Sequence, residues 1–158
     1  MIGKDNLIPI NGPDNPIITV SGVIKFSDRD DSSILLIKHE KTHTWNFPGG
    51  KVDKDESLED AIDRELYEEL GIVVEKKNIW YNEGVLVSME YPYGSGNLVY
   101  FKDYSFCIYS YKGLIENKEP NKHSDLLWIN IDVNPCIFDY PLNDIVSNYI
   151  EKRKSYNV

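Results

Sequence analysis

The spacing of apolar positions predicts several strands. Residues 17–26 (IITVSGVIKF) and 34–40 (ILLIKHE) are rich in aliphatic and β-branched residues, and the polar stretch 27–33 separates them. Short apolar runs bounded by turn residues are typical of β-strands, so this pair predicts a hairpin. Residues 98–113 are apolar or aromatic on both faces and are expected to be buried on both. The same reasoning predicts further strands over residues 72–81, 84–91 and 126–133.

Two segments have the 3.6-residue spacing of a helix. The first is predicted over residues 58–70, where Ser57 and Asp60 have capping-box spacing and Gly71 is placed to end the helix. The second follows Pro141 and carries a helical apolar pattern. Strands and helices in this order predict an α/β fold in which helices pack on a mixed sheet. The apolar positions of the second helix are Leu142, Ile145, Val146, Tyr149 and Ile150.

Length and composition narrow the protein class. The 158 residues fit one domain over residues 16–158, preceded by an irregular arm over residues 1–15. Cys107 and Cys136 lie far apart without CxxC spacing, which favours reduced thiols in a cytoplasmic protein. The chain has no apolar run of roughly 18 residues, the length of a membrane helix, and the first residues lack the apolar segment of a secretion signal.

Net charge bears on the choice of ligand. The formal charge is −9, which makes nucleic acid an unexpected partner because binding to phosphates needs lysines and arginines. If the ligand is an anion, a bound cation would have to attract it.

Three glutamates crowd the end of the first predicted helix. On a helical wheel, Glu65 and Glu69 fall inside the apolar arc and Glu68 lies at its edge. A solvated charge run would occupy the opposite face. Carboxylates on a half-buried face repel one another and lose hydration, and Arg64 cannot balance all three. The pattern indicates a site for a hard divalent cation such as Mg²⁺, although structural ion-pair networks produce similar clusters.

The wider segment from Gly50 to Ile72 resembles the Nudix box. Its pattern is Gly-x5-Glu-x7-Arg-Glu-aliphatic-x-Glu-Glu-x-Gly-aliphatic, and all nine specified positions agree. The preceding WNFPGG, residues 45–50, also resembles the usual lead-in. The resemblance implies a Nudix-type α/β/α sandwich with a mixed β-sheet over about residues 17–153.

This resemblance also implies roles for the box residues. The Gly49 carbonyl and the carboxylates of Glu68 and Glu69 would bind Mg²⁺ or Mn²⁺. Glu65 would be either another ligand or the base that deprotonates water, and Arg64 would orient the glutamates. Glu65, Glu68 and Arg64 are therefore the candidate catalytic residues.

Three box residues are expected to act through structure. Gly50, with Gly49, permits a sharp turn and close approach of the backbone to a ligand. Gly71 ends the helix. Glu56 either stabilises the loop before the helix or is a surface charge.

The implied reaction is metal-dependent hydrolysis of a diphosphate linkage in a nucleoside diphosphate derivative. Three features resemble the MutT-type enzymes, which convert a nucleoside triphosphate to a monophosphate and pyrophosphate. Glu119-Pro120 resembles a Glu-Pro that supplies a metal-binding carboxylate from outside the box; the alternative is a charged loop residue. Asn143 resembles an Asn that reads a base edge, or else caps the last helix. Phe47 and Tyr140 would flank a base, unless they only pack.

Other functions remain open. ADP-ribose, diadenosine polyphosphates and RNA 5′ ends are alternative substrates, and Tyr91 and Tyr93 lie near the distance loosely associated with diadenosine polyphosphate hydrolases. A nucleotide-binding Nudix regulator without catalysis is a further alternative, against which the intact carboxylates argue. We expect a monomer or homodimer. Three histidines lack metal-ligand spacing and are taken as surface or loop residues: His39, His43 and His123.

Overall fold

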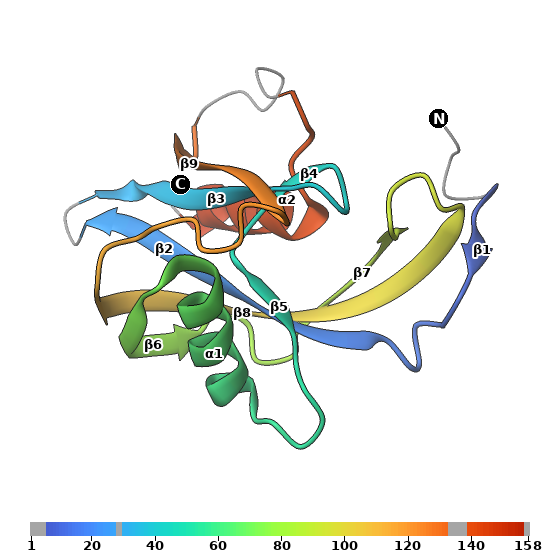
Figure 1. Cartoon of the computed structure of the whole chain (residues 1–158), viewed down its shortest axis with the longest axis horizontal. Coiled ribbons are helices and arrows are strands. Elements are labelled where there is room, and N and C mark those ends of the chain that lie inside the picture. Colours follow the sequence, from blue (N-terminus) through green and yellow to red (C-terminus); the bar gives the residue numbers. More distant parts are fainter. Residues whose placement is uncertain (1–5, 28–29, 133–138, 157–158) are drawn as a thin grey trace.

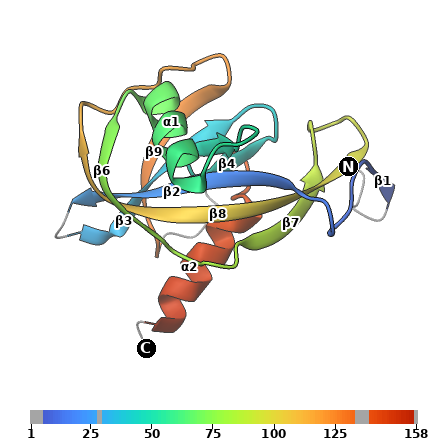
Figure 2. The same cartoon turned by 90° about the horizontal axis from the view of Figure 1, so that it is seen from below.

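In the part of the chain that the structure describes, a mixed sheet carries a helix on each face. The computed structural model describes residues 6–27, 30–132 and 139–156 (Figure 1). Figure 2 shows α1 (Leu58–Leu70) on one side of the sheet and α2 (Asp144–Tyr156) on the other. The predicted α/β/α sandwich is therefore confirmed. Across the described residues the strands are β1 (Ile8–Pro9), β2 (Ile17–Ser27), β3 (Asp30–His39), β4 (Thr44–Asn46), β5 (Gly49–Lys51), β6 (Val73–Ile79), β7 (Val85–Glu90), β8 (Asn97–Lys112) and β9 (His123–Asn130).

The sheet is apolar on both faces because both are covered. In β2, Val20 and Ile24 pack in the cluster under α1, whereas Val23 packs in the cluster with α2. Strand β8 alternates in the same way, with Phe106 on the α1 side and Cys107 on the α2 side. This alternation explains why the centre of β8 is buried on both faces, as predicted.

Strands β2 and β8 form the centre of the sheet. They pair in parallel, with Ile17 opposite Phe101 and Ile24 opposite Ile108. Strand β3 joins the other edge of β2 as the predicted antiparallel hairpin, and β9 pairs antiparallel with β3. Parallel pairing of β2 with β8 brings residues about 80 positions apart side by side.

Several segments differ from the sequence-based expectation. Residues 41–51, for which the sequence predicted no strand, contain the short strands β4 and β5, and the predicted irregular N-terminal arm contains β1, which pairs with β8. Strand β9 begins at His123, three residues before the strand predicted over residues 126–133. Short strands of this kind form because they satisfy backbone hydrogen-bonding groups. They need no regular spacing of apolar residues, so the apolar pattern does not predict them.

Helix α1 begins and ends as predicted. The Ser57 side chain accepts a hydrogen bond from the Asp60 backbone N–H, and Gly71 closes the helix in the left-handed conformation, with φ of 74°. Among the described residues, neither helix is long and apolar enough to cross a membrane. Cys107 is a buried free thiol, and Cys136 lies outside the described residues.

Candidate active site

The three glutamates of α1 differ sharply in exposure. Glu69 is 2% exposed and Glu65 has a 13% exposed side chain, whereas the Glu68 side chain is 50% exposed. The wheel therefore predicted the facing correctly, with Glu65 and Glu69 inward and Glu68 at the edge. Burial of a carboxylate without compensation is costly, so what each one contacts decides what it can do.

Arg64 joins the loop before α1 to the glutamates. Its Nε donates to Glu56 Oε2 at 2.8 Å, and its Nη1 donates to Glu65 Oε1 at 2.9 Å and Glu68 Oε2 at 3.3 Å. Its Nη2 donates to the Lys51 carbonyl at 2.9 Å. The hydrogen bond from Arg64, together with one from the Asp53 backbone, lowers the pKa of Glu56 to about 2. Glu56 thus ties the loop to the helix through Arg64.

Glu69 carries a buried oxygen atom without a partner. Its Oε1 accepts a hydrogen bond from the Gly49 backbone N–H at 3.2 Å, but its Oε2 is buried and accepts none from the described residues. Burial raises the pKa of Glu69 well above the usual value, and the charge of Glu65 adds to the effect. Burial also raises the pKa of Glu65, with Arg64 opposing the shift. A buried acceptor of this kind calls for a ligand.

Gly49 and Gly50 bring the backbone of β5 against these carboxylates. A Cβ on Gly50 would lie 2.5 Å from the Glu65 carboxyl group, and a Cβ on Gly49 would lie 2.0 Å from the Val20 carbonyl oxygen. No other residue fits either position without displacing backbone or the glutamate. The two glycines therefore let the backbone of β5 approach these neighbours closely, whereas the predicted close approach to a ligand stays a prediction.

An open pocket, here named the glutamate pocket, lies over the inward face of α1. Glu119 faces the same pocket as Glu65 and Glu69, and its carboxylate pairs with Lys122 Nζ at 3.0 Å. The segment between β8 and β9 thus brings Glu119 to the box carboxylates. The charge of Glu119 helps to raise the pKa of Glu69. The pocket lining consists of His39, Glu40, Lys41, Gly49, Gly50, Lys51, Glu65, Glu69, Tyr91, Glu119, Asn121, Lys122 and His123.

Two of the three histidines, which were all expected to be surface or loop residues, lie in strands. His123 begins β9 and is 2% exposed, and its Nε2 lies 3.9 Å from Glu69 Oε2. His39 ends β3, and burial lowers its pKa to about 4. Register across the sheet pairs His39 with His123, a relationship that residue spacing along the chain could not reveal. His43 does lie in a loop region, stacked between Tyr93 and Tyr140.

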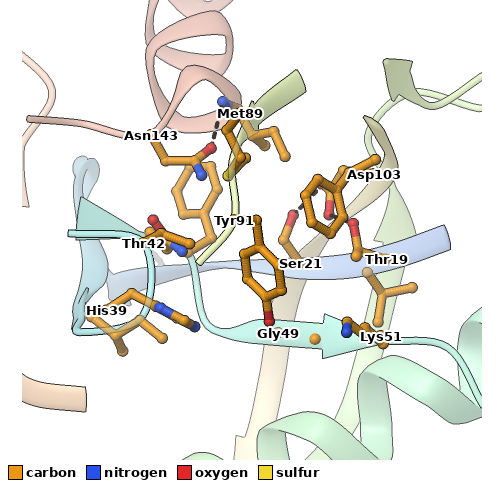
Figure 3. A pocket seen from close by; sticks show the side chains of 17 residues that line it. Thr19, Ser21, His39, Thr42, Gly49, Lys51, Met89, Tyr91, Asp103 and Asn143 are labelled. Atoms are coloured by element: carbon orange, nitrogen blue, oxygen red, sulfur yellow. Dashed lines mark hydrogen bonds between the residues drawn. The ribbon is translucent and has the colours of Figure 1, made fainter. Parts of the chain in front are cut away.

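A second pocket, here named the sheet pocket, adjoins the first (Figure 3). It is an open pocket of about 120 Å³, lined by both polar and apolar side chains. Asn143 and Phe47 line it, but Tyr140 lines neither pocket and instead bonds Glu40 through its hydroxyl. The Asn143 side chain also accepts from the Ile145 N–H, so it caps α2 while it faces the pocket.

Sequence reasoning missed an acidic group in the sheet pocket. Asp103 is 3% exposed and accepts hydrogen bonds from Ser21 Oγ at 2.6 Å and Thr19 Oγ1 at 2.8 Å. Ser105 Oγ donates a third bond at 3.0 Å. Burial raises the pKa of Asp103, and these hydroxyl groups oppose the shift. The signal was present as polar residues that interrupt two apolar strands, β2 and β8.

Tyr91 lies where the two pockets meet, a position that the sequence did not predict. It lines both of them, and Figure 3 shows its ring in the middle of the sheet pocket. The ammonium groups of Lys41 and Lys51 lie 4.7 and 5.2 Å from the centre of the ring. A ligand that spans the pockets must pass this ring and both positive charges. The residues shared by the pockets are His39, Gly49, Gly50, Lys51 and Tyr91.

The donor set suits a hard divalent cation, though it is not a closed cage. Glu69 Oε2 is an unpaired buried oxygen, and carboxylate oxygens are the ligands that Mg²⁺ prefers. Within the described ranges, no three His, Cys, Asp or Glu side chains are already gathered closely enough to hold an ion. Glu65 and Glu68 are held instead by hydrogen bonds from Arg64. Mg²⁺ commonly uses one or two carboxylates and completes its shell with water and substrate phosphates.

A family model described as the NUDIX domain matches residues 17–143, which is most of the chain. The chain belongs to the NUDIX domain family. The matched range contains both pockets almost entirely, from β2 to Asn143, with only Ile145 of the lining beyond it. The Nudix resemblance of the box is thereby confirmed.

Known NUDIX proteins resemble the chain in structure and in local sequence. The crystal structure of a MutT NUDIX hydrolase from Burkholderia pseudomallei is 27% identical, with a TM-score of 0.68, and the likeness covers 87% of this chain and 97% of that one. An 8-oxo-dGTP diphosphatase of Buchnera aphidicola is 52% identical over 40 residues, 25% of this chain and 32% of its own. An RNA pyrophosphohydrolase of Aeromonas hydrophila is 45% identical over 49 residues, 31% of this chain and 28% of its own. The chain spans about a third of the length of the curated relatives it matches.

Proposed function

We propose that this NUDIX protein is a divalent-cation-dependent hydrolase that cleaves a nucleoside triphosphate to a nucleoside monophosphate and pyrophosphate. The unpaired buried oxygen of Glu69, beside the Gly49 backbone, is the single observation on which the proposal depends. A buried carboxylate in this state is tolerable when a cation binds it. The likeness to MutT proteins supports the choice of substrate class.

The two pockets suggest how such a substrate is divided. The polyphosphate belongs in the glutamate pocket, where Lys41, Lys51 and Lys122 offer positive charge. The nucleoside belongs in the sheet pocket, where the amide of Asn143 and the carboxylate of Asp103 offer hydrogen-bonding groups to a base. The Phe47 and Tyr91 rings add apolar surface in the same pocket, and aromatic faces stack on bases.

The box residues then have distinct tasks. Glu69 and Glu68, with the Gly49 carbonyl and Glu119, are the candidate ligands of Mg²⁺ or Mn²⁺. Such an ion, when bound, neutralises phosphate charge and lowers the pKa of water. Arg64 holds Glu65 and Glu68 in place through Nη1.

Glu65 faces the Gly50 backbone from the apolar side of α1. In that position it serves either as a further ligand or as the group that takes the proton from the attacking water. Both roles require the glycine at position 50, because any side chain there would occupy the space of the Glu65 carboxylate.

A substrate panel tests the proposal. The purified protein is incubated with Mg²⁺ or Mn²⁺ and canonical nucleoside triphosphates, an oxidised guanine nucleotide, ADP-ribose and diadenosine polyphosphates. Pyrophosphate and monophosphate are then quantified by anion-exchange chromatography. We expect turnover of at least one triphosphate, abolished by a chelator. Tight nucleotide binding with no turnover across the panel would instead identify a non-catalytic nucleotide-binding protein.

RNA 5′ ends are a second candidate substrate. The local identity to RNA pyrophosphohydrolases supports it, whereas the net charge of −9 opposes binding to a long polyanion. Adding a short RNA with a 5′-triphosphate to the panel decides between the two. Faster pyrophosphate release from RNA than from every free nucleotide would favour the second candidate.

A further inference from the structure

His123 is a buried imidazole that the box motif does not contain. It lines the glutamate pocket from the first position of β9. Its backbone N–H donates to the Glu119 carbonyl at 3.0 Å, and its carbonyl accepts from Asn117 Nδ2 at 2.7 Å. The ring of His39 meets its ring edge to face, with centroids 5.3 Å apart. The first two contacts fix the backbone of His123, and the third packs its ring against His39.

The separation between His123 and Glu69 suits a shared ion better than a hydrogen bond. Nε2 and Oε2 lie 3.9 Å apart, beyond hydrogen-bonding reach. Bonds from Mg²⁺ or Zn²⁺ to oxygen or imidazole nitrogen are about 2.0–2.2 Å long. One ion can therefore contact both atoms without either side chain moving far. The Oε2 atom involved is the one that is buried without a hydrogen-bond partner.

We propose that His123 supplies a nitrogen ligand to the cation held by Glu69, so that this site favours Co²⁺ over Mg²⁺ more strongly than an all-oxygen site would. This inference rests on the proposed function, because it concerns the same cation. The chemical reason is that imidazole suits later first-row metals, whereas carboxylate, carbonyl and water oxygens suit Mg²⁺. Affinity along the first row also rises from Mn²⁺ to Co²⁺ and Ni²⁺.

Titration calorimetry of the full chain with Co²⁺ and with Mg²⁺, in separate experiments, tests the ligand. In the His123→Gln variant an amide oxygen replaces the ring nitrogen. We expect the Co²⁺ affinity to fall by about tenfold or more, since losing even an outer partner of a metal ligand costs that much. The Mg²⁺ affinity should fall less, because Mg²⁺ prefers oxygen ligands, so the ratio of Co²⁺ to Mg²⁺ affinity should fall. The visible absorption of bound Co²⁺ should change in the same variant.

His43→Asn is the matched control, because it removes an imidazole that lines neither pocket. Asparagine also tolerates the positive φ of 54° found there. We expect it to keep the wild-type metal ratio. An equal loss in both variants would mean that the metal binds histidines without preference for the Glu69 site, and it would overturn the proposal. An unchanged ratio in folded His123→Gln would overturn it as well.

Two further measurements keep the test decisive. If His123→Gln fails to fold, nuclear magnetic resonance of the wild-type protein with ¹⁵N-labelled histidine replaces it. Co²⁺ must then produce a large hyperfine shift at a His123 ring nitrogen, and its absence would refute the ligand. Glu69→Gln separates this inference from the proposed function: a wild-type affinity for Co²⁺ and Mg²⁺ in that variant would undermine the cation site itself.

Discussion

Arg64 and Glu56 form a two-point ion pair across the turn that leads into α1. Nε donates to Oε2 at 2.8 Å and Nη2 donates to Oε1 at 3.0 Å. Paired bonds of this geometry are stronger and more directional than single ones. Because the same guanidinium also holds Glu65 and Glu68, the pair links the stability of the turn to the arrangement of the candidate active site.

This pair predicts how stability changes in acid. The pKa of Glu56 is lowered to about 2 in the folded protein, so its contribution is fully present above the unfolded-state pKa of about 4.3 and is lost as pH falls towards 2. Glu56→Gln should therefore lower the melting temperature at pH 7, with a smaller difference from wild type near pH 2. Thermal unfolding followed by circular dichroism over this range measures both. If the difference in melting temperature did not change with pH, the stabilising contact between Arg64 and Glu56 would not depend on the charge of Glu56.

Glu69→Gln should have opposite effects on activity and on stability. Loss of the buried carboxylate should reduce kcat by about a hundredfold or more, beyond the effect of losing an outer-shell partner. The same change removes a buried carboxyl group whose ionisation is disfavoured by burial, so the metal-free variant should melt at a higher temperature than metal-free wild type.

Added Mn²⁺ should raise the melting temperature of the wild-type protein, since a ligand bound to the folded state stabilises it. It should do so far less in Glu69→Gln. Melting curves with and without Mn²⁺, and initial rates on the best substrate, provide the comparison. Full turnover by the variant would show that the reaction does not require the Glu69 carboxylate.

Tyr91 should control substrate affinity through its ring. Tyr91→Ala removes the surface shared by both pockets and should raise KM by about tenfold, the order expected from loss of one stacking contact. Tyr91→Phe keeps the ring and its contacts with Lys41 and Lys51, so it should stay close to wild type. Steady-state kinetics on both variants test this. A tenfold loss in Tyr91→Phe would assign the effect to the hydroxyl instead.

Asp103 should make stability decline as pH rises. Burial raises its pKa, so the folded state binds the proton more tightly than the unfolded state. Between the unfolded-state pKa of about 3.9 and the higher folded-state pKa, stability therefore falls with increasing pH. Asp103→Asn cannot ionise, so its stability relative to wild type should increase from pH 4 upwards until Asp103 is fully ionised. Urea unfolding at several pH values measures the free energy of unfolding of both proteins. If the two curves of this free energy against pH ran parallel, the prediction would be wrong.

The sequence by itself determined the features that depend on local periodicity. Ser57 and Gly71 predicted both ends of α1, and the wheel placed Glu65 and Glu69 on its buried face because a helix repeats every 3.6 residues. Apolar residues at consecutive positions predicted that β8 would be covered on both faces. The box motif then predicted the family, since its side chains are close together in the chain.

Tertiary structure alone decided which distant residues share a pocket. Thr19 donates to Asp103, 84 positions along the chain, because β2 and β8 pair in one particular parallel register. His123 faces Glu69 because β9 pairs with β3, an arrangement invisible to residue spacing. Local patterns specify which face of an element is buried, but strand register specifies what that face meets, and register depends on pairing between segments far apart in sequence.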